Sequence, residues 1–178
     1  MDQIQTSLEN HPPAPGRARP VAPLAHDARF MEHAIRLARA AGRRGEVPVG
    51  ALAVRQGIVL AAGSNEVERR QDASAHAELL VLRRASARLG SWRLDGITLY
   101  STLEPCPMCA GAILLARISR CVYGADDPRK GAFRSVYDVL ANPAGNHHPE
   151  VDGGEQAGAS GALLQAFFRE LRTSNRGA

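Results

Sequence analysis

The amino-acid sequence predicts an α/β fold in which helices pack on a layered sheet. Short apolar runs typical of strands alternate along the chain with segments whose apolar residues recur at helical spacing. The 178 residues are enough for one domain with its own core. No repeat or break in composition divides residues 27–172, which predicts a single domain there. A flexible proline-rich leader (residues 1–26) is expected before it and a short tail (residues 173–178) after it.

The first half of this domain is expected to contain a helix, a hairpin and a second helix. The first helix should begin at Asp27, its expected N-cap. Its apolar stripe consists of Phe30, Ala34, Leu37, Ala38 and Ala41. The hairpin, a polar loop and the second helix then follow over residues 50–54 and 58–62, 64–74 and 75–89.

The second half is expected to contain two strands, two helices and two loops. Pro107 opens a helix, because proline is favoured in a first helical turn. Residues 141–158 are rich in Gly, Asn, Pro and His, which favours a loop. The remaining elements follow in the order strand, helix, strand, charged loop and final helix, over residues 97–101, 108–117, 118–123, 126–135 and 159–172.

Composition narrows the class of protein. No run of about 18 apolar residues is present, which argues against a membrane span. The first segment lacks the apolar region of a secretory signal, so cytoplasmic residence is expected. Lysine and arginine number 22 against 18 acidic residues, and a formal net charge of +4 favours anionic partners such as nucleic acid. Three cysteines in a chain of this length argue against a disulfide scaffold.

Three residues form a candidate zinc site. His76, Cys106 and Cys109 offer one imidazole and two thiols, which are ligands that suit zinc. No fourth ligand is obvious, and a catalytic zinc typically has three protein ligands and one position for water. Both cysteines lie at the expected start of a helix, whose positive end favours the thiolate form that a metal needs.

Glu78 is the candidate general base and acid. Residues i and i+2 of a helix point to nearly opposite sides, so His76 and Glu78 can share a site only where the helix begins. Beside a zinc-activated water, Glu78 can take a proton and then pass protons to a ring nitrogen and a departing amine. The pattern therefore predicts a hydrolytic deamination of an amidine-like carbon.

Residues 27–172 resemble the bacterial tRNA-specific adenosine deaminases of the cytidine deaminase-like superfamily. The resemblance rests on the H-x-E and P-C-x-x-C motifs, with further matching runs at residues 46–51, 102–112, 123–125 and 163–169. It implies a three-layer fold with a central five-stranded mixed sheet flanked by helices. It also implies a homodimer, one zinc ion per subunit, and the wobble adenosine of an arginine tRNA as substrate.

The resemblance also assigns substrate contacts. Asn65 matches an asparagine that contacts the flipped nucleoside, and Pro48 and Val49 match the wall of the base pocket. Asp127 matches an aspartate near the RNA backbone, and Phe168 matches an aromatic residue on the closing helix. Glu66 departs from the pattern, because the family often has a basic residue there.

Several other residues carry simpler expectations. Cys121 should be a buried apolar residue, and Glu104 should have a structural hydrogen-bonding role. His147 and His148 should be solvent-exposed or face RNA. A basic group offers either a solvated surface or an RNA backbone track: Arg117, Arg120, Arg129, Lys130 and Arg134. A second group should be plain helix surface: Arg83, Arg84 and Arg88.

Two alternatives remain open from the sequence. The first is another deaminase of the superfamily that acts on free guanine, cytosine or cytidine, with the same chemistry and a different pocket. The second is a non-enzymatic RNA-binding module with a structural zinc. A structural site would need four protein ligands, and the sequence offers three obvious ones.

Overall fold

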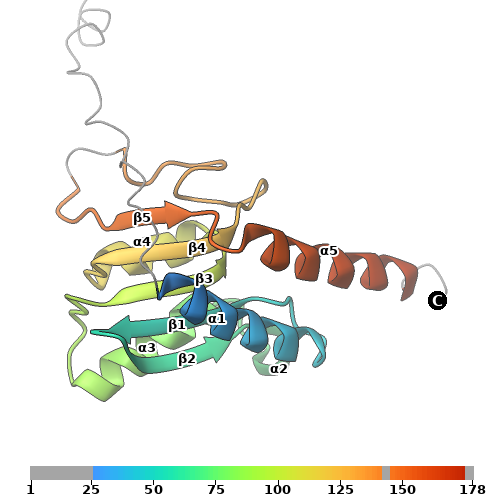
Figure 1. The fold of residues 1–178 in the computed structure, drawn as a ribbon, viewed down its shortest axis with the longest axis horizontal. Helices are drawn as coiled ribbons and strands as arrows, with labels where there is room; N and C mark the ends of the chain where they lie inside the picture. Colours follow the sequence, from blue (N-terminus) through green and yellow to red (C-terminus); the bar gives the residue numbers. More distant parts are fainter. Residues whose placement is uncertain (1–25, 142–144, 175–178) are drawn as a thin grey trace, which may run out of the picture.

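The structure is a computed structural model that describes residues 26–141 and 145–174. The predicted leader up to residue 25 and the last four residues of the predicted tail lie outside this range. The described part contains a mixed five-stranded sheet with the strand order β2-β1-β3-β4-β5 (Figure 1). The strands are β1 (Gly50–Arg55), β2 (Ile58–Ser64), β3 (Thr98–Leu103), β4 (Arg120–Ala125) and β5 (Glu150–Gly153). β1 is antiparallel to β2 and β3, whereas β3, β4 and β5 are parallel.

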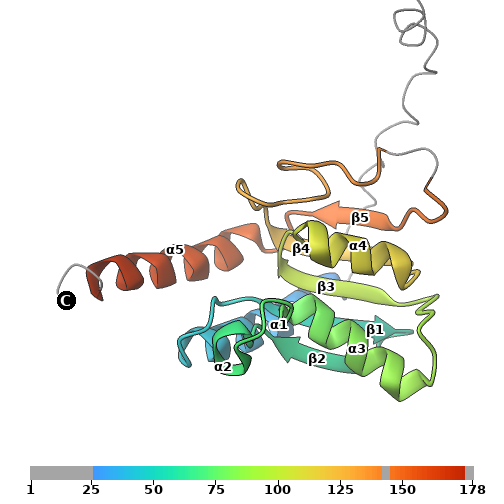
Figure 2. The same ribbon diagram turned by 180° about the vertical axis from the view of Figure 1, so that it is seen from behind.

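Helices cover both faces of this sheet, as the three-layer fold requires. α1 and α5 lie on one face, and α3 and α4 lie on the other (Figures 1 and 2). The helices are α1 (Asp27–Gly42), α2 (Val67–Arg70), α3 (Ala77–Leu89), α4 (Pro107–Leu115) and α5 (Ala157–Ser174). None of the helices in the described residues is long and apolar enough to cross a membrane.

Alternating side chains of the central strands form two cores. Leu52 and Val54 of β1 pack with Phe30 under α1, while Ala51 and Ala53 belong to the core beneath α3 and α4. Gly50 brings α1 close to the sheet, because a Cβ atom at this position would lie 2.2 Å from the carbonyl oxygen of Ala34. β1 is therefore buried on both faces, and this packing fixes its position next to the site.

Two predicted loops contain regular structure. The polar loop over residues 64–74 includes the short helix α2, and the loop over residues 141–158 includes β5. β5 pairs along β4 through its backbone, from Arg120 with Glu150 to Tyr123 with Gly153. A four-residue strand without apolar alternation gives no local signal, so only its tertiary pairing reveals it.

A buried charge network corrects two predictions. The N-cap of α1 is His26 rather than Asp27, which is the first helical residue and is only 1% exposed. Arg120 is buried as well, and its guanidinium contacts the carboxylates of Asp27 and Asp152 at 2.8 and 2.7 Å. The Tyr100 hydroxyl donates to Asp27 at 2.6 Å. Arg120 thus joins α1, β4 and β5 and is not part of a surface track for RNA.

The three predicted surface arginines of α3 are exposed, and two of them also have a structural role. Arg84 and Arg88 lie one helical turn apart and donate to the carbonyl oxygens of Ala62 and Leu60. These carbonyls belong to β2, the edge strand, whose outer side would otherwise be open to pairing with another chain. Glu66, which stands where the family often has a basic residue, also lies beside the edge strand β2. It forms ion pairs with three arginines: Arg69, Arg70 and Arg84.

Candidate active site

Two helix starts bring the three predicted metal ligands together. His76 is the N-cap of α3, and Cys106 is the N-cap of α4, with Pro107 as the first residue of that helix. His76 Nδ1 lies 3.6 Å from Cys106 Sγ and 3.5 Å from Cys109 Sγ. Both helices begin at the same end of the sheet, where β3 and β4 end and β1 begins, which is where α/β folds place their ligands.

The spacing of these donor atoms fits zinc. A tetrahedral zinc with bonds of about 2.0 Å to nitrogen and about 2.3 Å to sulfur separates the two donors by about 3.5 Å. All three donor atoms lie within 4.8 Å of one another, and no other such group occurs among the described residues. The set offers three protein ligands, which is the number found in catalytic zinc sites.

The surroundings of Cys106 lower the pKa of its thiol. A hydrogen bond from Cys109 lowers the pKa of Cys106 to about 4, despite the opposing effect of burial. Donating that hydrogen bond, together with burial, raises the pKa of Cys109. This lowered pKa favours the thiolate form of Cys106, which is the form that a metal binds.

Glu78 lies directly beside this group. It is in the first turn of α3, two residues after the N-cap, so it satisfies the predicted condition for sharing a site with His76. Its side chain is 4% exposed and lines the same cavity as His76 and Cys106. Burial raises the pKa of Glu78 above its ordinary value, which suits a group that must both accept and release a proton.

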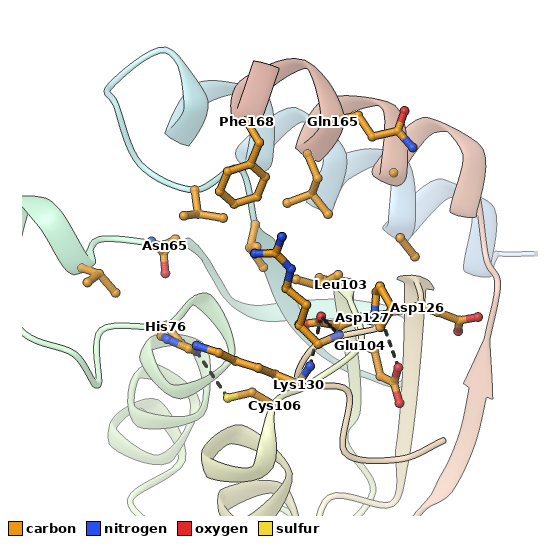
Figure 3. A pocket seen from close by; sticks show the side chains of 18 of the residues that line it. Asn65, His76, Leu103, Glu104, Cys106, Asp126, Asp127, Lys130, Gln165 and Phe168 are labelled. Carbon is orange, nitrogen blue, oxygen red and sulfur yellow. Dashed lines mark hydrogen bonds between the residues drawn. The ribbon is translucent and has the colours of Figure 1, made fainter. Parts of the chain in front are cut away.

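A large cavity opens above these residues (Figure 3). Its volume is about 1240 Å³, which is ample for a nucleoside. Four of the predicted substrate contacts line it: Val49, Asn65, Asp127 and Phe168. Pro48 is buried against Gly42 instead, and Val47 lines the cavity beside Val49.

Glu104 holds the loop that forms one wall. Its carboxylate accepts hydrogen bonds from the backbone N–H groups of Asp127, Phe133, Arg134 and Ser135, and from the Ser135 hydroxyl. Burial alone would raise the pKa of Glu104, but these donors, led by Ser135, lower it. Gly131 packs so tightly on this carboxylate that a Cβ atom would lie 2.1 Å from Glu104 Oε2. The predicted structural role of Glu104 is confirmed.

The basic residues at the cavity differ from the predicted group. Arg129 and Lys130 line it, together with Arg169 and Arg172 of α5. Arg134 instead pairs with Asp126 at 2.8 Å. Arg117 donates to the carbonyl oxygen of Asn146, and His147 lies within 2.6 Å of the carbonyl oxygen of Ile118. The basic lining of the cavity therefore contains two of the five predicted residues and two more from α5.

One buried residue near the cavity, Glu46, was not predicted from the sequence to belong to the site. Glu46 is 1% exposed and lies 3.1 Å from the side-chain amide of Asn65. Its signal in the sequence is a lone charge at the start of the otherwise apolar run 46–51. Cys121 is fully buried, as predicted.

Comparison with known proteins places this chain in a class of enzymes, the deaminases. Residues 25–172 match a family model described as MafB19-like deaminase, which spans nearly all of the described chain. A guanine deaminase structure from Nitrosomonas europaea is similar at a TM-score of 0.68 and 26% identity, over 88% of this chain and 93% of that one. The chain is a member of the deaminases of this fold.

Other comparisons narrow the family. The tRNA-specific adenosine deaminase of Bacillus subtilis (strain 168) is 44% identical over 155 residues, which cover 87% of this chain and 96% of that protein. A structure from a study of A-to-I editing by tRNA:A34 deaminases is 46% identical with a TM-score of 0.74, over 76% of this chain and 99% of that one. This chain belongs to the family of tRNA-specific adenosine deaminases.

Proposed function

We propose that this protein hydrolyses the wobble adenosine (A34) of a transfer RNA to inosine and ammonia, with an arginine tRNA as the substrate. The observation that carries the proposal is the convergence of His76, Cys106 and Cys109 beside the buried Glu78 in a cavity of nucleoside size or larger. Two of the similar proteins named above are described as tRNA deaminases, which supports the same substrate here. We expect the protein to act in the cytoplasm.

His76, Cys106 and Cys109 would hold one zinc ion per subunit. When bound, zinc supplies a water molecule activated for attack on carbon. Glu78 accepts one proton from that water and donates it to the ring nitrogen of adenine. It then takes the second proton from the oxygen newly bonded to the ring carbon and passes it to the departing amine. The balance is one water consumed and one ammonia released for each inosine formed.

The rest of the cavity would hold the nucleotide and its neighbours. Val49 and Asn65 contact the flipped nucleoside on one side, whereas Asp127 and Phe168 lie towards the RNA chain. The four basic side chains at the cavity contact phosphate groups: Arg129, Lys130, Arg169 and Arg172. A cavity of this volume with a cationic lining fits a polynucleotide better than a free base.

The exposed face of α4 supports a homodimer. Met108 and Leu115 are seven residues apart on one face of the helix, and they are 40% and 76% exposed. Gly111 lies between them on that face, with open space in front of its Cα. We expect a second copy of the chain to cover this apolar strip.

Substitution of Glu78 and His76 tests the catalytic assignment. Glu78→Ala should retain zinc and fold while inosine formation falls on the order of 10²- to 10⁴-fold, because the proton shuttle is lost. His76→Ala should lose zinc by metal analysis. Glu32→Ala, on the exposed face of α1, is the matched control. Full activity in Glu78→Ala would remove this residue from the mechanism.

The substrate is tested by inosine mapping on total tRNA, with guanine, cytosine and cytidine as competing substrates. The similarity to a guanine deaminase is the observation that favours the alternative function, deamination of a free base. Turnover of free bases without turnover of tRNA would favour that alternative. A fourth protein ligand on the bound metal would instead favour a structural-zinc module.

A further inference from the structure

Glu46 is a buried carboxylate surrounded by N–H donors. It lies in the segment before β1 and is 1% exposed. Glu46 Oε1 accepts a hydrogen bond from the backbone of Arg69 at 2.8 Å. Glu46 Oε2 accepts one from the backbone of Glu68 at 3.2 Å and one from Asn65 Nδ2 at 3.1 Å. Among the described residues no basic side chain forms a salt bridge with it, so these N–H groups balance its charge.

This contact decides how the Asn65 amide is oriented. Nδ2 must face Glu46, because the reversed amide would place two oxygens against each other without a proton between them. The backbone of Asn65 is fixed as well, since its N–H donates to the carbonyl oxygen of Val49 at 2.9 Å. The side chain cannot reverse without breaking the contact with Glu46.

The fixed amide turns its oxygen to the cavity. Asn65 is 6% exposed and lines the cavity with His76 and Glu78. Figure 3 shows the oxygen of Asn65 directed towards His76 in that view. An oxygen here accepts a hydrogen bond and cannot donate one.

We propose that Glu46 is a positioning residue for substrate specificity, because it holds Asn65 so that an acceptor faces the nucleoside. This inference rests on the proposed function and adds the chemical type of the substrate group that Asn65 recognises. That group must carry an O–H or N–H bond, as a ribose hydroxyl does. Unprotonated ring nitrogens of adenine are acceptors, and they do not satisfy this oxygen.

A charge-conserving pair of substitutions tests the orientation. Glu46→Gln is best accommodated with its oxygen in place of Oε2, where it still accepts from Asn65 and Glu68 without the strength that a charge gives, while its nitrogen opposes the N–H of Arg69. Asn65→Asp places two carboxylates together. In the double variant E46Q/N65D, the glutamine amide donates a hydrogen bond to the aspartate. The second oxygen of that aspartate still presents an acceptor to the cavity, and the aspartate side chain has no N–H group that could donate instead.

We expect Asn65→Asp, which sets two carboxylates against each other, to raise KM for tRNA on the order of 10-fold, and Glu46→Gln to raise it by less, with kcat changed less than about threefold in both. The double variant should return KM to within about threefold of the wild type. A double variant that regains thermal stability but not KM would overturn the acceptor assignment. An Asn65→Asp variant with wild-type KM would overturn the positioning role. Glu32→Gln, the same chemical change on the surface of α1, is the control.

A second measurement separates this inference from the proposed function. Urea unfolding of the wild type, both single variants and the double variant gives the coupling between Glu46 and Asn65 without any activity assay. Additive effects on unfolding would overturn the contact itself. A wild-type protein that forms no inosine on tRNA would overturn the proposed function, while the coupling still reports on the contact.

Discussion

Glu104→Gln tests how strongly one carboxylate organises the cavity wall. The carboxylate accepts five hydrogen bonds from the loop 127–135, three on Oε1 and two on Oε2. A glutamine amide is best accommodated with its nitrogen in place of Oε2. Three backbone bonds then remain on the oxygen, and the Ser135 hydroxyl can rotate to accept. The backbone N–H of Asp127 loses its acceptor.

The magnitude follows from these contacts. A buried N–H without an acceptor costs about 1–3 kcal/mol, and the remaining bonds lose the strength that a charged acceptor gives them. We therefore expect a loss of about 2–4 kcal/mol in the free energy of unfolding. For a chain of this size that lowers Tm by about 5–15 °C. Since Asp127 lies at the cavity, KM for tRNA should rise about 10-fold while kcat changes little.

The pH dependence has a definite sign. The pKa of Glu104 in the folded protein is lowered by its donors relative to its ordinary value of 4.5. The stability that it contributes is present above that value and is lost as the pH falls through the folded pKa. The difference in unfolding free energy between wild type and variant should therefore be constant from about pH 8 to pH 6 and shrink below about pH 4.5.

Thermal and urea unfolding across this pH range, with steady-state kinetics on tRNA, measure these effects. Glu150→Gln carries the same chemical change at an exposed position and is the control. A difference that grows as the pH falls would refute the argument, because protonation would then strengthen the contacts of Glu104. An unchanged KM together with the expected loss of stability would show that the loop does not position the substrate.

Three further predictions concern the rest of the molecule. Arg120→Met leaves Asp27 and Asp152 without their guanidinium partner, so urea unfolding should show a loss of about 3–5 kcal/mol; a loss below about 1 kcal/mol would contradict the buried network. Leu115→Arg should convert a dimer to a monomer in sedimentation, whereas a variant that sediments like the wild type would place the interface elsewhere. The affinity for tRNA should fall steeply with salt, and Arg169→Ala should reduce the slope of log affinity against log salt by about 1; an unchanged slope would mean that Arg169 contacts no phosphate.

The elements that could be predicted from the sequence are those with a local signal. The first and last helices have apolar periodicity, and the hairpin has a turn signal, so they were located to within a few residues. The candidate metal site was predictable because ligand chemistry restricts the residue types. Its geometry also followed from local rules, since N-cap positions and a proline in the first turn orient His76, Cys106 and Cys109.

The remaining features depend on partners that are distant in sequence. Arg120 has the same local appearance as Arg129, but Asp27, 93 residues away, makes the first a buried ion-pair residue, while the second lines the cavity. Glu46 is similar, because its three donors all come from the segment 65–69. Composition therefore gives the number of charges, whereas only the packed structure separates those that hold the fold from those that can meet a substrate.

This separation changes how the basic charge of the chain is interpreted. Arg84, Arg88 and Arg120 donate to backbone or carboxylate groups within the protein. The cationic lining of the cavity comes instead from the loop after β4 and from α5, whose positions depend on Glu104 and on the β4–β5 pairing. The proposed RNA-binding surface should therefore be sensitive to substitutions of residues that do not contact RNA. Arg120→Met should therefore weaken tRNA binding as well as stability, and wild-type affinity in a folded Arg120→Met protein would break that link.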